Sequence, residues 1–188
     1  MRKSELLLIL IIPCLILLTS FYFNVFNFEV SYGAQEVLSY LKGDKTDLGF
    51  LTERELLHLK DVKNLLDFIF YLFYIFIFVF IFLSLYVYKK CSREKLFKSL
   101  LAGGVFSIVF LIFLASGAFF VFDWIFLRFH LFAFSNDFWI LPMDSVLIDL
   151  FPEEFFYDMF MKILVWAFGV SFGLVVIAWA LEKNTKPK

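Results

Sequence analysis

Two residue types that often carry chemistry are scarce in this chain, which has only two cysteines and two histidines among 188 residues. Cys14 lies in a long apolar run and Cys91 in a strongly basic segment, so they cannot form a disulfide in an extracytoplasmic domain. The histidines show no H-x-x-x-H or H-E-x-x-H spacing, and a zinc site needs at least three protein ligands, so we expect no metal and no cofactor. Ser135 lacks the flanking glycines of a nucleophile elbow, which argues against a serine hydrolase.

Charged residues are absent from four long stretches of the sequence. These stretches are Leu6–Phe28, Phe68–Tyr88, Ser99–Phe122 and Ile163–Leu181. Hydrophobic residues make up 62% of the chain, and a helix needs about 20 apolar residues to cross the hydrocarbon core of a bilayer. Backbone polar groups must be satisfied inside lipid, so the spans should be helical. We therefore predict an all-α membrane protein, a single membrane domain over residues 1–188. Its four transmembrane helices are expected at about 6–28, 66–88, 99–122 and 162–182.

Basic residues are concentrated in the two tails and in residues 89–98. These segments hold 10 of the 17 basic residues and three acids, Glu5, Glu94 and Glu182. Lys and Arg favour the cytoplasmic side of a membrane. We therefore expect a multi-pass protein of the plasma membrane with both termini in the cytoplasm. Residues 29–65 and 123–161 would then face outward and form a small extracytoplasmic cap.

Local signals predict several helix boundaries. Residues 31–43 are typical of a short helix that ends at Gly43. Thr52 and Glu55 have the spacing of a capping box, and a helix that begins there can run unbroken into the second span. In the last span, Gly169 and Gly173 have G-x-x-x-G spacing, which we interpret as a helix-packing motif.

The two histidines are the candidates for acid–base chemistry. His58 shares a helix face with Glu55 and Asp61, each three positions away, and either carboxylate could orient its imidazole. His130 follows the third span by eight residues, so both histidines should lie near the outer membrane surface. The alternative is that each is an interfacial histidine with a satisfied hydrogen bond and only a structural role.

The residues after His130 combine apolar bulk with polar groups. That combination fits a pocket for the head region of a lipid. With the two acids near His58, they form the predicted substrate-binding set. The set is Glu55, Asp61, Phe132, Phe134, Asn136, Asp137 and Trp139.

Two stretches resemble the signatures of the lipoprotein intramolecular transacylase (Lit) family. They are "FLTERELLHLKDVK" and "FHLFAFSNDFW", the second followed by "FPEEFF". The resemblance implies a four-helix transmembrane bundle with an extracytoplasmic cap, and His58 and His130 as its two catalytic histidines. The segment between Trp139 and Pro152 is shorter than the family pattern, which leaves Asp144 without a clear counterpart.

The resemblance also implies a reaction. The substrate would be a diacylglyceryl lipoprotein, whose sn-2 acyl chain moves to the α-amine of the N-terminal cysteine to give the lyso form. The implied partners are this lipoprotein and membrane lipid, with no nucleic acid, and we expect a monomer. The competing hypothesis is a small integral membrane protein without enzymatic activity that binds lipid or a partner protein.

Overall fold

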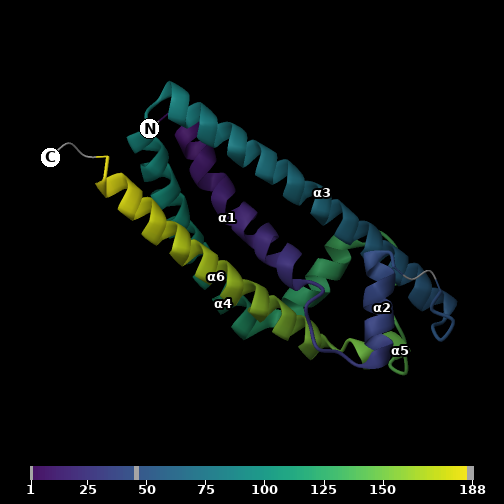
Figure 1. Ribbon diagram of the computed structural model, residues 1–188. Helices are drawn as coiled ribbons and strands as arrows, with labels where there is room; N and C mark the ends of the chain where they lie inside the picture. Colours follow the sequence, from purple (N-terminus) through teal and green to yellow (C-terminus); the bar gives the residue numbers. More distant parts are fainter. Residues whose placement is uncertain (1, 45–46, 186–188) are drawn as a thin grey trace.

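The computed structural model describes residues 2–44 and 47–185, and every regular element in them is an α-helix. The helices are α1 (Lys3–Asn24), α2 (Tyr32–Lys42), α3 (Glu53–Lys90), α4 (Arg93–Ala133), α5 (Val146–Leu150) and α6 (Glu153–Lys183). Helices α1, α3, α4 and α6 are long and apolar enough to cross a membrane. The predicted all-α membrane fold is confirmed, and the four long helices form an elongated bundle (Figure 1).

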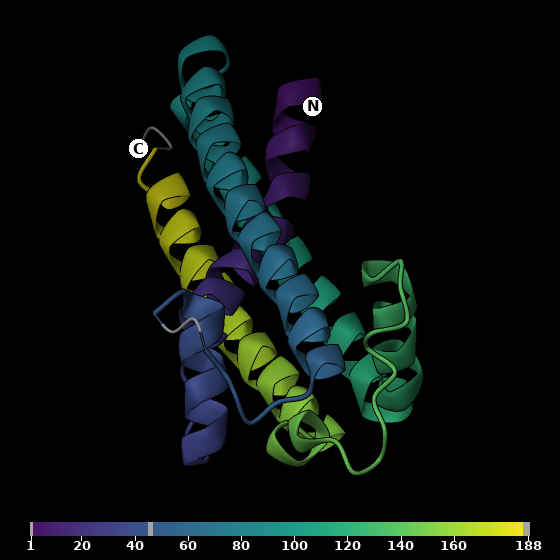
Figure 2. The same cartoon turned by 90° about the vertical axis from the view of Figure 1, so that its right-hand side faces the viewer.

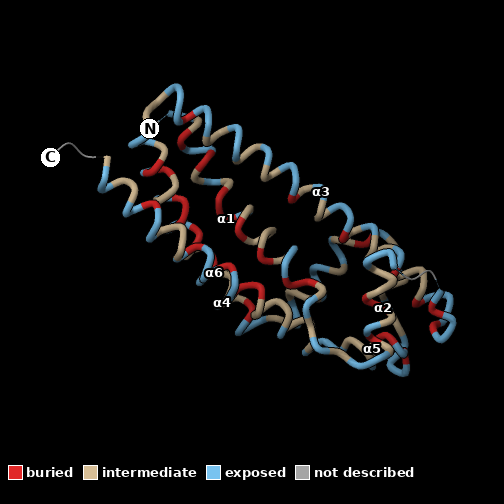
Figure 3. The backbone as a smooth tube through the Cα atoms, in the orientation of Figure 1, coloured by how far each residue is buried: buried red, intermediate tan, exposed pale blue. Residues whose placement is uncertain are grey.

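Helix α1 lies between α3 on one side and α4 and α6 on the other (Figure 1). The buried residues of these helices gather where the helices face one another (Figure 3). This core consists of Leu8, Ile12, Ile16, Val87, Leu111, Leu164 and Ala167. Large apolar side chains such as Phe78 and Trp166 are exposed on the outside of the bundle, as a surface in contact with lipid requires.

Two adjacent glycines allow α4 to approach its neighbours closely. A Cβ atom at Gly103 would lie 3.1 Å from Ile12 Cβ in α1, and one at Gly104 would lie 2.8 Å from a methyl group of α6. A Cβ atom at Gly169 or Gly173 would meet no described atom within 4 Å. The helix-packing interpretation of the G-x-x-x-G spacing is therefore wrong within this chain, because the packing glycines are those of α4.

This difference between the glycines makes a testable prediction. Gly103→Leu should lower the midpoint of thermal unfolding in detergent, because overpacking a tight contact destabilises by about 1–3 kcal/mol. Gly169→Leu is the matched control, with the same substitution at an open position of a long helix, and should leave the midpoint unchanged. Equal midpoints for the two variants would contradict the assignment of the packing glycines.

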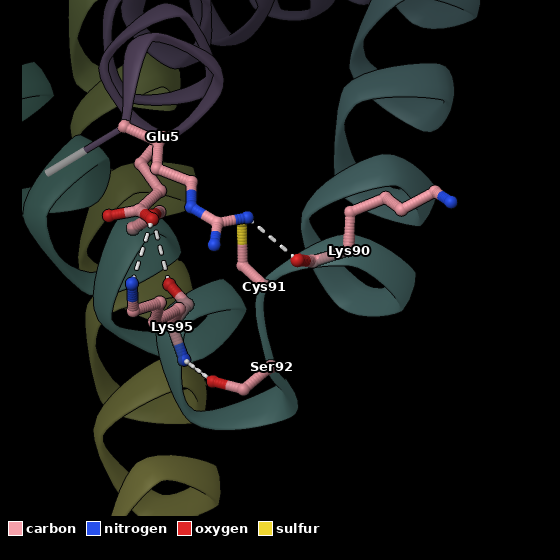
Figure 4. A network of polar contacts seen from close by, with 7 residues as sticks. Glu5, Lys90, Cys91, Ser92 and Lys95 are labelled. Atoms are coloured by element: carbon pink, nitrogen blue, oxygen red, sulfur yellow. Dashed lines mark hydrogen bonds and ion pairs between the residues drawn. The ribbon is translucent and has the colours of Figure 1, made fainter.

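The beginning of α1 and the end of α6 lie at the same end of the bundle as the turn between α3 and α4 (Figure 1). The Arg2 guanidinium donates a hydrogen bond of 2.8 Å to the carbonyl of Lys90. The buried carboxylate of Glu5 lies 3.4 Å from the ammonium of Lys95 (Figure 4). These contacts fix the beginning of α1 to the α3–α4 turn. We call this the basic end of the bundle.

The opposite end carries a cap made of α2, α5 and the segments around them (Figure 2). Helix α2 ends at Gly43, whose φ of 93° is the left-handed conformation that favours glycine. The cap has its own small core, in which residues of α2, of the segment between α2 and α3, and of α5 pack against the start of α3. This core consists of Val37, Leu48, Leu51, Leu59 and Leu147.

Helix α4 does not end at residue 122, where the charge-free stretch ends. It is interrupted at Val121, whose φ of −144° and ψ of 38° are not helical, and then continues to Ala133. We call residues 122–133 the arm. The arm folds back beside the first half of α3 instead of continuing the line of α4 (Figure 2). The part of the chain expected to begin the outer cap is therefore a helix that returns toward α3.

Candidate active site

His58 is positioned by the beginning of α3. The capping box is present: Thr52 accepts a hydrogen bond from the Glu55 N–H, and the Glu55 carboxylate accepts one from the Thr52 N–H. These bonds satisfy backbone donors that a helix start otherwise leaves unpaired. The helix therefore begins at Glu53 and places His58 in its second turn, half-buried beneath the cap.

His130 is positioned by the arm. It lies in the last turn of α4, where its Nδ1–H donates a hydrogen bond of 2.8 Å to the carbonyl of Phe126. Because the arm folds back, the imidazoles of His58 and His130 face each other with ring centroids 6.2 Å apart. The structure thus brings together two histidines that are 72 positions apart in the sequence.

Aromatic rings enclose the two imidazoles. The ring of Phe134 lies 5.2 Å from that of His58 and 5.7 Å from that of His130. The rings of Trp139 and Phe126 lie 5.2 Å and 4.4 Å from His130. The pair therefore sits in an apolar environment that disfavours a positive charge.

Both histidines lie outside the charge-free stretches, and both have a lowered pKa. Burial lowers the pKa of His58 to about 4, assisted by His130 and opposed by Asp61. Burial also lowers the pKa of His130, against the effect of its hydrogen bond to Phe126. Both imidazoles are therefore neutral near pH 7, and each has one protonated and one unprotonated nitrogen.

The segment after the arm is fastened to α3 by polar contacts. The Asn136 side-chain amide donates a hydrogen bond of 2.9 Å to Asp61, and its oxygen accepts one from the Phe138 N–H. Arg54 donates to the backbone carbonyls of Asp137 and Ile140. This function of Arg54 could not be predicted from the sequence, because its only signal there is a position one turn before His58. These contacts hold Trp139 against His130.

A cavity of about 260 Å³ lies between α3 and the end of the arm. Neither histidine lines it, but Phe134, whose ring contacts both imidazoles, does. Asp61, Asn64 and Phe68 line it from α3, and Phe134 and Asn136 line it from the other side. Its wall thus combines apolar rings with a carboxylate and two amides. Of the predicted substrate-binding residues, Asp61, Phe134 and Asn136 line this cavity, and Trp139 contacts His130.

Three other predicted residues have different surroundings. Phe132 is 93% exposed on the arm, and the Asp137 side chain is exposed while its carbonyl accepts from Arg54. Glu55 is 1% exposed. Its carboxylate accepts hydrogen bonds from Thr52, from the Ser145 hydroxyl (2.5 Å) and from the Leu147 N–H (3.0 Å).

The bonding of Glu55 corrects the expectation that it orients His58 or binds substrate. Burial by itself would raise the pKa of Glu55, but its hydrogen bonds to Ser145, Thr52 and Leu147 outweigh burial and lower the pKa to about 2. One oxygen accepts from Thr52 at the start of α3 and the other from Ser145 and Leu147 at the start of α5, and His58 is not among these donors. Glu55 therefore joins α3 to the cap.

The chain has four helices able to span a membrane, a cap at one end of their bundle and a facing pair of neutral histidines beneath the cap. These features define a multi-pass integral membrane protein whose polar site lies where bundle and cap meet. The family model for "Lipoprotein intramolecular transacylase Lit" matches residues 22–156. The chain belongs to this family, and the resemblance found in the sequence is confirmed.

Solved structures give the same fold. The chain is 25% identical to the membrane integral lipoprotein intramolecular transacylase Lit from Bacillus cereus, with a TM-score of 0.81 over 97% of this chain and 96% of that one. A variant of that protein with one histidine replaced by arginine matches with a TM-score of 0.76, at 24% identity, over 97% of this chain and 92% of that one. An uncharacterized Aquifex aeolicus protein is 30% identical over 135 residues, which cover 71% of this chain and 58% of that protein.

Proposed function

We propose that this protein is a lipoprotein intramolecular transacylase. Its substrate would be a diacylglyceryl lipoprotein, and the sn-2 acyl chain would move to the α-amine of the N-terminal cysteine. The product is a lipoprotein with an N-acyl cysteine and a monoacylglyceryl group. The observation that carries the proposal is the facing pair His58 and His130, 6.2 Å between ring centroids, inside the part of the chain that matches the family.

The reaction needs little more than positioning and proton transfer. The amine nitrogen forms a bond to the ester carbonyl carbon, the bond from that carbon to the sn-2 oxygen breaks, and one proton passes from nitrogen to oxygen. An ester becomes an amide, which is downhill, so no nucleotide is consumed. Both reacting groups belong to one molecule, and holding them in a reactive geometry supplies much of the acceleration.

We assign His130 as the general base. Its Nδ1 carries a proton, because it donates to the Phe126 carbonyl, so in the neutral ring Nε2 has the free electron pair. That nitrogen can accept the proton that leaves the amine and later deliver it to the sn-2 oxygen. The hydrogen bond to Phe126 also holds the ring in place, as an orienting group does in other acid–base sites.

We assign His58 as the donor that stabilises the negative charge on the ester oxygen. Its Nδ1 is buried without a hydrogen-bond partner among the described residues. A buried N–H without a partner is disfavoured. The neutral ring therefore carries its proton on Nε2. A fixed N–H directed at the developing oxyanion stabilises the tetrahedral intermediate.

The charge distribution supports an orientation for the site. The basic end holds the beginning of α1, the end of α6 and the α3–α4 turn, and Lys and Arg favour the cytoplasm. We therefore place the basic end inside the cell and the histidine pair at the outer face of the plasma membrane. Labelling of Lys95→Cys by an impermeant reagent on intact cells would contradict this orientation, whereas labelling of Lys42→Cys agrees with it.

A reporter lipoprotein tests the proposed activity. The chain would be co-expressed with a diacylglyceryl reporter in cells that lack N-acylation of lipoproteins. Mass spectrometry of the N-terminal peptide should then show one acyl chain on nitrogen and one on the glyceryl group, with the total mass unchanged. Fragmentation separates the two isomers. Reporter that keeps both chains on the glyceryl group would favour a lipid-binding protein without enzymatic activity.

A further inference from the structure

The arm has one face that packs against the rest of the protein and one that does not. Phe122, Phe126 and His130 recur at every fourth position, and their rings contact rings of α6 and α3. The other face follows the spacing i, i+3, i+4 and i+7 of a single helical stripe. This stripe, which we call the outer face of the arm, consists of four exposed residues, Trp124, Leu127, Arg128 and Leu131. Three of the four are apolar.

Both ends of the arm extend this apolar surface. Phe132, in the last turn, is 93% exposed, and Phe119 and Phe120 are exposed at the bend where the arm begins. Removing one such side chain from water contributes about 1.5–3 kcal/mol, and soluble proteins rarely leave a contiguous apolar patch uncovered. Phe113, two turns before Phe120 on the same side of α4, belongs to the lipid-facing surface of the bundle. The apolar surface of the arm therefore adjoins a surface that lipid already covers.

The contacts of the arm place it at the level where the apolar spans end. At its start, the ring of Phe122 lies 5.2 Å from that of Tyr157 and 6.3 Å from that of Phe160. These two residues precede the charge-free stretch of α6 by about 5–9 Å of helix. Just after the arm, Phe134 lines a cavity together with Phe68, the first residue of the charge-free stretch of α3. An interfacial helix buries its apolar face about 5–10 Å into the boundary between headgroups and acyl chains, which is the level of the arm.

The charges of the arm suit the same level. The guanidinium of Arg128 lies over the ring of Trp124, 5.3 Å from its centroid. Trp is enriched at membrane–water interfaces, and an Arg side chain covers apolar surface with its stem while its head reaches the polar layer. A guanidinium there can form paired hydrogen bonds with a phosphate. Asp123, at the edge of the outer face, is close enough to Glu153 for the two carboxylates to repel each other, and Glu153 lies outside the apolar stretch of α6.

We propose that the arm is an interfacial helix embedded in the leaflet at the cap end of the bundle. Its outer face contacts the upper part of the acyl chains, and Arg128 binds lipid phosphates. The arm thus belongs to the membrane phase, whereas all of residues 123–161 were expected in an extracytoplasmic cap. Because His130 projects from the opposite face, lipid around the arm holds this imidazole at the depth of the headgroups.

A second copy of the chain is a poorer occupant of the outer face. A helix of the length of the arm, residues 122–133, is about 18 Å long and 10 Å wide. That area is well below the roughly 800 Å² that each partner of a stable protein interface buries. The bilayer needs no such minimum, because it covers any apolar surface at its own depth.

Fluorescence quenching by lipid tests the position of the arm. Phe132→Cys and Met143→Cys would each be made in the full chain with Cys14→Ala and Cys91→Ala and labelled with bimane. Met143 is the matched control because it is 89% exposed but lies near Ser145, which bonds to Glu55 about 20 Å before the charge-free stretch of α3.

The labelled chains would be placed in vesicles of palmitoyl-oleoyl phosphatidylcholine and phosphatidylglycerol. Adding a phosphatidylcholine with a nitroxide near the carbonyl end of one acyl chain should quench the label at position 132 by more than about two-fold, as expected for a helix at this depth. The label at position 143 should keep its intensity. Equal intensities at the two positions would overturn the proposal. So would disulfide-linked dimers of Phe132→Cys at high dilution in lipid, which would assign the outer face to a second copy.

Arg128 gives an independent measurement in the same vesicles. Arg128→Glu should reduce the quenching at position 132, because a carboxylate is repelled by lipid phosphates, and Arg128→Lys should retain it. Quenching that is the same in the glutamate and lysine variants would refute the assignment of Arg128 to phosphates. These measurements do not use acyl transfer, so the position of the arm and the proposed function can fail separately.

Discussion

Replacing His130 with alanine is expected to lower the rate of acyl transfer by about 10²–10⁴, the usual loss when a general base is removed. His58→Ala should cause a similar loss through the unstabilised oxyanion. The proportion of N-acylated reporter after short incubations measures both effects. The fold should persist, because the bundle core lies among other residues of the long helices and contains neither histidine.

Amide substitutions separate the two roles. His58→Gln offers an N–H near the position of Nε2 and should retain more than ten times the activity of His58→Ala, about the share that one donor contributes. His130→Gln cannot act as a base and should be as inactive as His130→Ala. His130→Asn can still donate a hydrogen bond to the Phe126 carbonyl, so its inactivity would not come from a lost packing contact. Retained activity in His130→Gln and none in His58→Gln would reverse the assignments.

Glu55→Ala is expected to release the cap from the bundle. Its carboxylate accepts hydrogen bonds from Thr52, Ser145 and Leu147 in an enclosed site. Hydrogen bonds to a charged group contribute about 1.5–3 kcal/mol each, and the abandoned donors would stay buried. Backbone amides of residues 145–151 should therefore exchange hydrogen for deuterium more than ten times faster, while those of the transmembrane segments should keep their protection.

Glu53→Ala is the matched control, because it removes an exposed acid from the same first turn of α3. It should leave exchange of the cap unchanged, and equal exchange in the two variants would contradict the proposed link.

The same link makes the cap sensitive to acid. Because the pKa of Glu55 falls from 4.5 to about 2, its stabilisation is complete above pH 4.5 and is lost as the pH falls toward 2.

The transmembrane fold could be predicted from the sequence because its signal is simple. Uncharged stretches long enough to cross a bilayer allow few structures other than helices. The start of α3 could be predicted equally well, because the capping box between Thr52 and Glu55 is a local pattern. The similar depth of the two histidines could be predicted because each lies just outside a charge-free stretch, a constraint that the membrane imposes and a soluble protein would lack.

Other features depend on contacts that a local pattern does not contain. Ser145 and Leu147, which donate hydrogen bonds to Glu55, lie about 90 positions after it in the sequence. Arg54 binds backbone carbonyls, which have no sequence signature. The bend at Val121 falls at the end of the charge-free stretch 99–122, but neither a proline nor a glycine stands there, so the sequence does not distinguish a helix that ends from one that folds back. The G-x-x-x-G spacing identified small residues but not the face that meets a neighbour.

The unbroken length of α3 has a consequence for how the protein responds to its host membrane. From Glu53 to Lys90 the helix contains neither proline nor glycine, so it has no hinge to absorb a mismatch between its apolar stretch and the bilayer. Mismatch is then relieved mainly by tilting the whole helix. His58 lies beyond the apolar stretch on the same continuous helix, so it moves when the helix tilts. Bilayer thickness thereby sets the height of the histidine pair relative to the ester groups of the surrounding lipid.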